Sequence, residues 1–124
     1  MLLDPDEVQC PIREMLARAG GRWTLDVVVA LDKGARHFGD LVRTIPGVSR
    51  RMLVVTLRGM ERDGLIARSG ESSTGERVYY ELTSLGVDLG EHFRALSRWS
   101  QRNRDEIYAA RERFDATART AGSC

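Results

Sequence analysis

The side chains of this sequence that are best suited to binding chemistry are the arginines of its central part. Residues 36–80 contain eight arginines and five acidic residues, whereas residues 1–35 contain four basic and six acidic ones. A guanidinium group can make two parallel hydrogen bonds to a phosphate or to guanine, so the middle of the chain is a candidate anion-binding region. Lys33 is the only lysine, and a genome rich in G and C would favour arginine equally well.

Spacing places several of these arginines on one side of a predicted helix. On a helical wheel of about 100° per residue, Leu57 and Met60 fall within about 40° of Leu53 and mark the core side. The residues on the opposite side, roughly 140° to 200° away, are Arg51, Val55, Arg58 and Arg62. This side predicts a surface that reads DNA. The alternative is a solvated helix face on which Glu61 and Asp63 neutralise the arginines.

The position of each residue along this helix suggests its role. A recognition helix enters the major groove with its N-terminal residues nearest to the base edges. We therefore expect Arg51 and Val55 to contact bases, Arg51 at guanine and Val55 at a thymine methyl group. We expect Ser49, Arg50 and Arg58 to contact phosphates, because the amides and dipole at a helix N-terminus favour anions.

Catalytic and metal-binding patterns are missing from the sequence. The only histidines are His37 and His92, and we find neither a spaced carboxylate pair nor a glycine-rich phosphate loop. Cys10 and Cys124 lie at opposite ends with no Cys or His at metal-ligand spacing, which predicts neither a zinc site nor a disulfide framework. We expect no enzyme, no cofactor and no metal, and we expect His37 to cap a helix or to lie at the surface.

Cys10 has two open interpretations. It precedes a predicted helix, whose dipole would favour the reactive thiolate, but Asp4, Asp6 and Glu7 lie close in sequence and oppose it. A thiol sensor and a half-buried packing residue at a dimer interface therefore both remain open.

Two helices are predicted before the basic region. The first starts at Cys10 and has an apolar stripe that stops at Gly20. Thr24 can cap the second, in which residues 27–31 form a buried apolar run. This run is rich in β-branched residues, so a strand remains the alternative.

The next two helices indicate a helix-turn-helix. An apolar pattern over residues 38–45 predicts a short helix closed by Pro46 and Gly47. Ser49 can cap the following helix, which should run to about Asp63 with Gly64 as its stop. Two helices that meet across a tight turn are typical of DNA-binding proteins, although other folds also contain such turns.

A β-hairpin is predicted after this motif. Residues 65–68 and 78–82 look like short strands, and residues 69–77 form a polar, glycine-containing loop. Arg68 and Arg77 flank the tip and could lie over phosphates or enter the minor groove. Ion pairs with Glu71 or Glu76 are the alternative.

The last part of the chain predicts a dimerisation element. Thr83 can cap a long helical region in which apolar residues recur every three or four positions. A helix of that length beside a small domain leaves part of its stripe uncovered, and pairing with the first helix of a second copy would bury it. The residues expected at the dimer interface are Ile12, Leu89, Phe93, Leu96, Trp99 and Ile107.

Length and composition fit one globular domain. The chain has 124 residues, of which 42% are hydrophobic and 30% charged. No apolar run approaches the roughly 18 to 20 residues of a membrane span, and the first residues carry acids where a secretory signal carries Lys or Arg. We expect a cytoplasmic protein without membrane partners.

We also expect a mainly α winged helix-turn-helix with a small β-hairpin, as a single domain over 1–124. Within it, 10–22 forms the N-terminal helix, 36–83 the helix-turn-helix plus wing, and 84–118 the dimerisation helix or helices.

Several different short motifs follow one another along the chain in a defined order. They are Cys10-Pro11, Gly21-Arg22-Trp23-Thr24, His37-Phe38-Gly39-Asp40-Leu41, Ile45-Pro46-Gly47-Val48-Ser49, Met52-Leu53, Leu57-Arg58, Asp63-Gly64-Leu65-Ile66, Val78-Tyr79-Tyr80, Leu82-Thr83, Leu85-Gly86 and Trp99. Each motif is weak alone, but together, over roughly residues 10–99, they resemble the HxlR family of bacterial transcriptional regulators.

This resemblance implies a MarR-like winged helix that forms homodimers through its terminal helices and binds a palindromic operator in double-stranded DNA. Many members of the family respond to oxidants, quinones or aldehydes, and Cys10 falls on the position of the family's sensing cysteine. The chain departs from the family in the hairpin loop, where residues 72–76 replace a proline-containing stretch, so we rank Arg77 below Arg51 as a DNA contact. Two other functions remain as alternatives: a protein-interaction module, and a regulator that binds an aromatic effector non-covalently.

Overall fold

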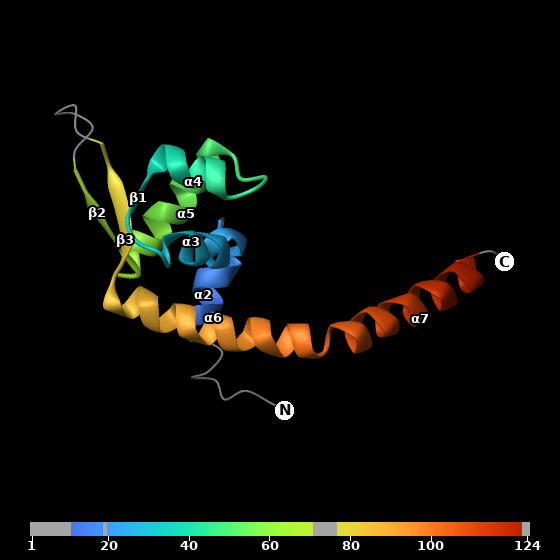
Figure 1. The fold of residues 1–124 in the computed structure, drawn as a ribbon. Helices are drawn as coiled ribbons and strands as arrows, with labels where there is room; N and C mark the ends of the chain where they lie inside the picture. The colour runs from blue at the N-terminus through green and yellow to red at the C-terminus, as the bar shows by residue number, and fades with distance from the viewer. Residues whose placement is uncertain (1–10, 19, 71–76, 123–124) are drawn as a thin grey trace. The chain divides into compact units, whose positions relative to one another are not determined.

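The computed structural model describes residues 11–18, 20–70 and 77–122. It forms two compact units, Met1–Gly90 and Glu91–Cys124, which are described separately (Figure 1). The expectation of a single domain stays a prediction.

The helices of the first unit follow the predicted order, but the first is shorter than the predicted range 10–22. They are α2 (Pro11–Ala17), the 3-10 turn η1 (Gly21–Trp23), α3 (Thr24–Leu31), α4 (Phe38–Thr44) and α5 (Arg50–Arg62). Residues 27–31 are helical, so the strand alternative is wrong. The cap predicted at Thr24 is also wrong, because η1 runs directly into α3 and Trp23 occupies the cap position without a side-chain bond. Thr24 is buried as the first residue of α3.

The helix-turn-helix is capped as the sequence predicts. His37 caps α4, since its Nδ1 accepts a hydrogen bond from the backbone N–H of Asp40 at 3.2 Å. Gly47, with a φ of +82°, makes the left-handed turn that glycine adopts without strain. Ser49 caps α5, because its Oγ accepts from the N–H of Met52 at 3.0 Å.

The sheet has three strands where two were predicted. β2 (Ile66–Ser69) and β3 (Tyr79–Leu82) form the expected antiparallel hairpin. A third strand, β1 (Arg36–His37), pairs antiparallel with β3 and gives the order β1-β3-β2. A strand of two residues has no alternation to detect, which is why the sequence did not reveal it.

The core of this unit is built by α3, α4, α5 and β2. Its fully buried side chains include Val27, Leu41 and Leu53, and burying each aliphatic side chain stabilises the fold by about 1.5–3 kcal/mol. The start of α6 (Ser84–Arg102) packs on the same unit. A Cβ added to Gly86 would lie 2.1 Å from the carbonyl oxygen of Leu65, so only glycine fits there.

Apart from the break at Asn103, the described residues of the second unit are helical. α6 ends at Arg102, and α7 (Arg104–Gly122) follows after a break at Asn103, whose side-chain amide donates to the carbonyl of Trp99 at 2.8 Å. Bonding its own side chain to the preceding turn is a known way in which asparagine interrupts a helix. Within the described residues, no helix is long and apolar enough to cross a membrane.

Candidate nucleic-acid interface

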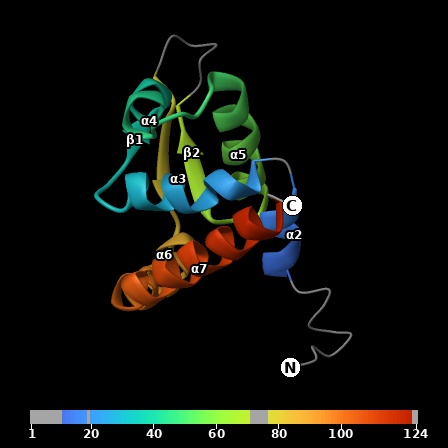
Figure 2. The ribbon, with the colours of Figure 1, turned by 90° about the vertical axis from the view of Figure 1, so that its right-hand side faces the viewer.

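The outer face of α5 is open to solvent. Leu53, Leu57 and Met60 are buried, as the helical wheel predicts. The predicted DNA contacts on and before this helix are all exposed: Ser49, Arg50, Arg51, Val55 and Arg58. The N-terminal end of α5 and the loop end of the β2–β3 hairpin point toward the same side of the unit (Figure 2).

The arginines on this face are not neutralised by the acids that the alternative interpretation invoked. Arg58 and Arg62 form no ion pair with any residue that the structure describes. Asp63 instead bonds the guanidinium of Arg18. Arg50 lies over the ring of Phe38, with its guanidinium carbon 5.8 Å from the ring centroid. The guanidinium groups of Arg58 and Arg62 are therefore not paired with a carboxylate of the described residues.

A groove brings α5 and the hairpin together. It has a volume of about 430 Å³ and is lined by Val54, Leu57, Arg58, Glu61, Arg68 and Tyr80. Arg68 and Tyr80 are cross-strand partners on β2 and β3, while Arg58 lies on α5. Two guanidinium-bearing residues from separate elements thus line one groove, together with one carboxylate, that of Glu61.

Burial changes the acidity of Tyr80, one of the groove residues. It raises the pKa of the Tyr80 phenol because the phenolate would lose solvation, and the charge of Arg68 acts in the opposite direction. Tyr80 therefore stays neutral at physiological pH and can donate a hydrogen bond to an anion.

The two valines of α5 face different neighbours. Val54 lines the groove toward the hairpin, whereas Val55 lines a narrow cleft with Met15, Arg18 and Gly59. Sequence analysis missed Val54 because it lies 100° from Leu53 on the wheel, outside the sector that we chose. The signal available in the sequence was an apolar residue four positions before Arg58, which places both residues on the same side of the helix.

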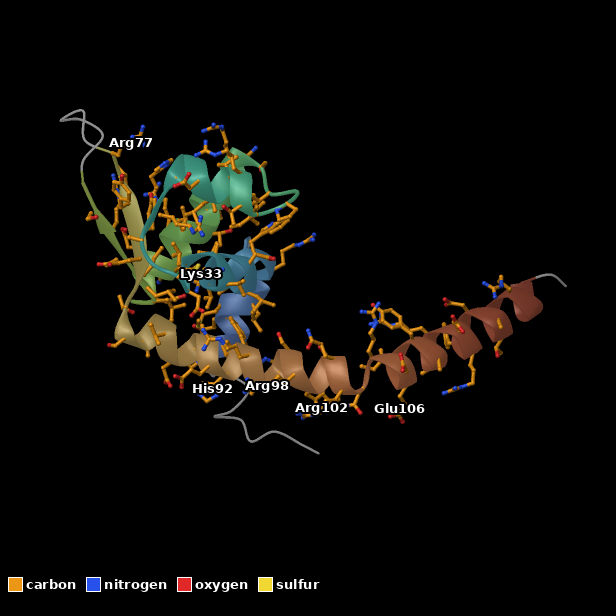
Figure 3. All side chains as sticks on the ribbon, viewed as in Figure 1. Lys33, Arg77, His92, Arg98, Arg102 and Glu106 are labelled. Atoms are coloured by element: carbon orange, nitrogen blue, oxygen red, sulfur yellow. The ribbon has the colours of Figure 1, made fainter. Side chains whose placement is uncertain are left out.

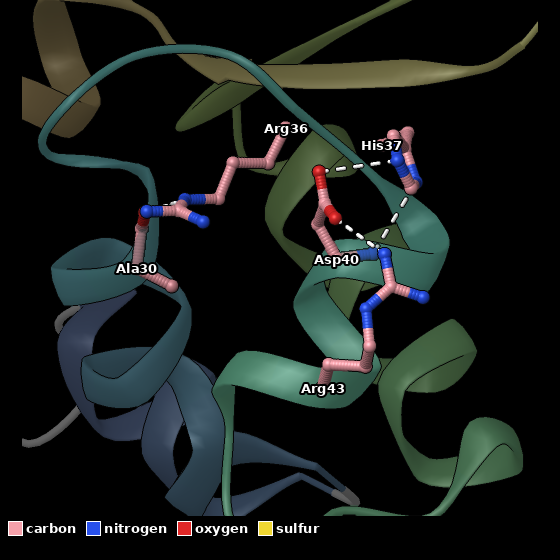
Figure 4. A network of polar contacts seen from close by, with 5 residues as sticks. All are labelled: Ala30, Arg36, His37, Asp40 and Arg43. Atoms are coloured by element: carbon pink, nitrogen blue, oxygen red, sulfur yellow. Dashed lines mark hydrogen bonds and ion pairs between the residues drawn. The ribbon is translucent and has the colours of Figure 1, made fainter.

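A polar network holds the start of α4 in place (Figure 4). Asp40 accepts a hydrogen bond from Arg43 and lies 3.1 Å from Nε2 of His37. The bond from Arg43 holds the pKa of Asp40 below its ordinary value, with His37 adding to the effect. Arg36 donates to the carbonyl of Ala30 at 2.8 Å. Arg36 and Arg43 thus form hydrogen bonds within the protein, unlike Arg58 and Arg62, which form no ion pair with a described residue.

The wing contributes one further predicted residue. Arg77 is exposed at the loop end of the hairpin (Figure 3). Glu71 and Glu76, its alternative partners, lie outside the described residues. The structure therefore brings Arg58 and Arg68 to one groove and leaves Arg77 at the edge of the hairpin.

Cys10 also lies outside the described residues. Of the predicted dimer residues, Ile12, Leu96 and Trp99 are exposed, and the half-buried ones are Leu89, Phe93 and Ile107. Among the large hydrophobic side chains of the described residues, Phe114 on α7 has the largest exposed fraction, 73%. Sequence analysis missed it although it stands seven residues after Ile107.

Known proteins share this pattern. Residues 19–108 match the family model described as HxlR-like helix-turn-helix. The chain is 39% identical over 104 residues to the HTH-type transcriptional regulator YtfH of Escherichia coli, covering 84% of this chain and 82% of that protein.

Solved structures agree with these matches. A structure named as the transcriptional regulator YtfH of Salmonella typhimurium superposes with a TM-score of 0.72 at 36% identity, over 88% of this chain and 97% of the other. The redox regulator HypR in its reduced form superposes with a TM-score of 0.68 at 28% identity, over 81% and 99%. These proteins are named as regulators, which confirms the expectation that the chain is not an enzyme.

Proposed function

Because the chain belongs to the HxlR-like helix-turn-helix family of transcriptional regulators, we propose that it is a homodimeric repressor of a palindromic operator. α5 would read the operator, and Cys10 would make binding respond to oxidants, quinones or aldehydes. Because the protein would bind a chromosomal operator, the proposal includes a cytoplasmic location. The observation that carries the proposal is the exposed arginine face of α5 beside the groove.

The groove supports a specific way of holding DNA. When α5 lies in the major groove and the hairpin over the neighbouring minor groove, the phosphate backbone that separates the two grooves must pass between them. Arg58 and Arg68 line this passage from opposite sides. We therefore assign phosphate contacts to Arg58, Arg68, Ser49 and Arg50, and base contacts to Arg51, with Arg77 reaching toward the minor groove.

Exposed apolar surface supports the dimer. Leu96 and Trp99 are 61% and 51% exposed on α6, and leaving such large side chains in water is unfavourable by about 25 cal/mol per Å². A second copy would cover them together with Ile12, Leu89, Phe93 and Ile107. Two-fold symmetry would then place two α5 helices at half-sites roughly one helical turn apart.

The sensing part rests on the family and on a named redox regulator among the solved structures. A thiolate at Cys10 could form a disulfide across the dimer or add to a small electrophile. A non-covalent aromatic effector is the alternative, and no specific observation favours it.

The test is a mobility shift with the DNA upstream of the chain's own gene, at two salt concentrations, with and without a quinone. We expect a salt-sensitive shift that the quinone releases, and release should be lost in Cys10→Ser. A shift that ignores the quinone would remove the thiol sensor and keep the regulator. The absence of a shift on any DNA would favour a protein-interaction module.

A further inference from the structure

The short segment after α2 contacts the recognition helix α5 at its end. Arg18 donates a hydrogen bond from Nη2 to Oδ2 of Asp63, the C-cap residue that directly follows α5. The side chains of Arg18 and Asp63 are only 31% and 23% exposed. An ion pair that is partly shielded from water is stronger than a pair on the open surface.

The same segment contacts α5 at its middle. The carbonyl oxygen of Gly20 lies 3.2 Å from Oγ1 of Thr56, which is buried and also donates to the carbonyl of Met52. Gly20 has a φ of +84°, and a Cβ there would lie 2.7 Å from the Thr56 hydroxyl. The backbone can approach α5 this closely only because residue 20 is glycine.

Little space remains between the two elements. The cleft lined by Met15, Arg18, Val55 and Gly59 holds about 10 Å³, enough for at most one water molecule. Packing this close transmits a displacement to the neighbouring helix instead of absorbing it. The orientation of α5 is thus tied to Arg18 and Gly20, which we call the α2–α5 joint.

We propose that Arg18 is a positioning residue for operator recognition, which fixes the angle of α5 through Asp63 without touching DNA itself. The inference rests on the proposed function. Arg18 approaches the C-terminal end of α5, whereas a recognition helix reads bases with its N-terminal residues. Because the two half-sites are read by two copies of α5, a small change in the angle of each helix misplaces both relative to the operator.

This role predicts a separation between specific and non-specific binding. Non-specific affinity comes from phosphate neutralisation, which depends on the exposed arginines and tolerates a change of angle. Specific affinity depends on aligned base contacts and does not tolerate it. Loss of Arg18 should therefore lower the ratio of operator affinity to non-specific affinity.

The experiment measures both affinities and their salt dependence for Arg18→Ala, Asp63→Asn and the exchanged pair Arg18→Asp with Asp63→Arg. We expect both single variants to lose operator affinity by roughly tenfold, within the range of coupled neighbouring residues. Non-specific affinity and the salt slope should stay unchanged, and the exchanged pair should recover most of the loss. Arg13→Ala is the matched control, since Arg13 is an exposed arginine of α2 without a bond to any described residue.

Two results would overturn the proposal. If Arg18→Ala binds the operator as tightly as the wild type, the joint does not set recognition. If its affinity falls equally on all DNA and the salt slope drops by about one, Arg18 is a phosphate contact instead.

Amide NMR spectra test the joint without DNA and confirm that each variant is folded. We expect Arg18→Ala and Asp63→Asn to shift the same amide signals along α5, including that of Thr56, while Arg13→Ala leaves them in place. Unmoved α5 signals in Arg18→Ala would refute the joint. A wild type that binds no DNA, with the α5 signals shifting as expected, would refute the proposed function and leave the joint standing.

Discussion

In the DNA contact that we propose, the residues of α5 have different roles. Arg58 lines the groove beside the wing and Arg51 is exposed, whereas the neighbouring valines differ in what they face. Val54 lies toward the hairpin and Val55 toward α2. Val54 is therefore better placed than Val55 to contact a thymine methyl group.

Replacing thymine by uracil in the operator tests this assignment, because it removes only the methyl group. We expect one uracil substitution in each half-site to weaken the wild type roughly fourfold, the value of about one buried methylene. Val54→Ala should lose the same affinity on thymine and show no further loss on uracil. Val55→Ala is the control and should keep the uracil effect, and the assignment is wrong if the two variants exchange these behaviours.

The lowered pKa of Asp40 predicts how the free energy of unfolding changes at acid pH. Its pKa in the folded protein lies below the ordinary 3.8, so it favours the folded state above that pH and loses this contribution as the pH falls through the lowered value. Urea unfolding at several pH values between about 6 and 3 should show this loss in the wild type. The loss should be smaller in Asp40→Asn and in Arg43→Ala, and an unchanged acid profile in both would contradict the prediction.

The sequence predicted the residues of α5 well because helical periodicity separates an inner from an outer face. Ser49, Arg51 and Arg58 are exposed as expected. Periodicity does not say which part of the outer face meets the wing, so Val54 was missed. The bond between Arg18 and Asp63 joins residues 45 positions apart, and no local pattern could reveal it.

At the scale of elements, the start of α6 depends on a close approach to the loop before β2. Thr83 caps α6, with its Oγ1 accepting from the N–H of Gly86 at 3.1 Å and donating to the carbonyl of Gly64 at 2.6 Å. Gly86 packs on the carbonyl of Leu65 with no room for a Cβ.

We expect Gly86→Ala to destabilise the protein by about 1–3 kcal/mol, because the methyl group would meet backbone that cannot move aside easily. Gly59→Ala is the matched variant inside α5, where a Cβ would lie 3.5 Å from Nε of Arg18, an ordinary contact. It should gain up to about 1 kcal/mol from helix propensity. Both values can be read from urea unfolding curves, and equal effects of the two substitutions would show that the packing at Gly86 is looser than described.

Helices with clear caps and periodicity were predicted from the sequence. A strand that forms only by pairing with another strand was not. Ser49 and Thr83 predicted where α5 and α6 begin, because a capping side chain is a local signal in the sequence. β1 exists only because β3 pairs with it, so residues 36 and 37 carry no pattern of their own. The sequence did not reveal the break at Asn103, so whether residues 84–118 form one helix or two was left open.

For the whole molecule, the proposed binding of a palindromic operator requires that two copies of the chain pair. Leu96→Glu places a charge on the apolar stripe of α6 at a side chain that is already exposed, so the monomer should remain folded. We expect sedimentation to show a monomer and operator affinity to fall at least tenfold, since each half-site is then bound alone. Ser97→Glu, at the neighbouring exposed position, should remain dimeric. A dimeric Leu96→Glu would place the interface elsewhere.

The salt dependence of operator binding tests the proposed DNA-binding surface, with fluorescence anisotropy used to follow binding of the wild type, Arg58→Ala and Arg68→Ala. We expect the logarithm of affinity to fall linearly with the logarithm of salt concentration. Each substitution should lower that slope by about one, because one phosphate contact is lost. Affinity that does not change with salt, or slopes that both substitutions leave unchanged, would contradict the assignment of α5 and the wing as the DNA-binding surface.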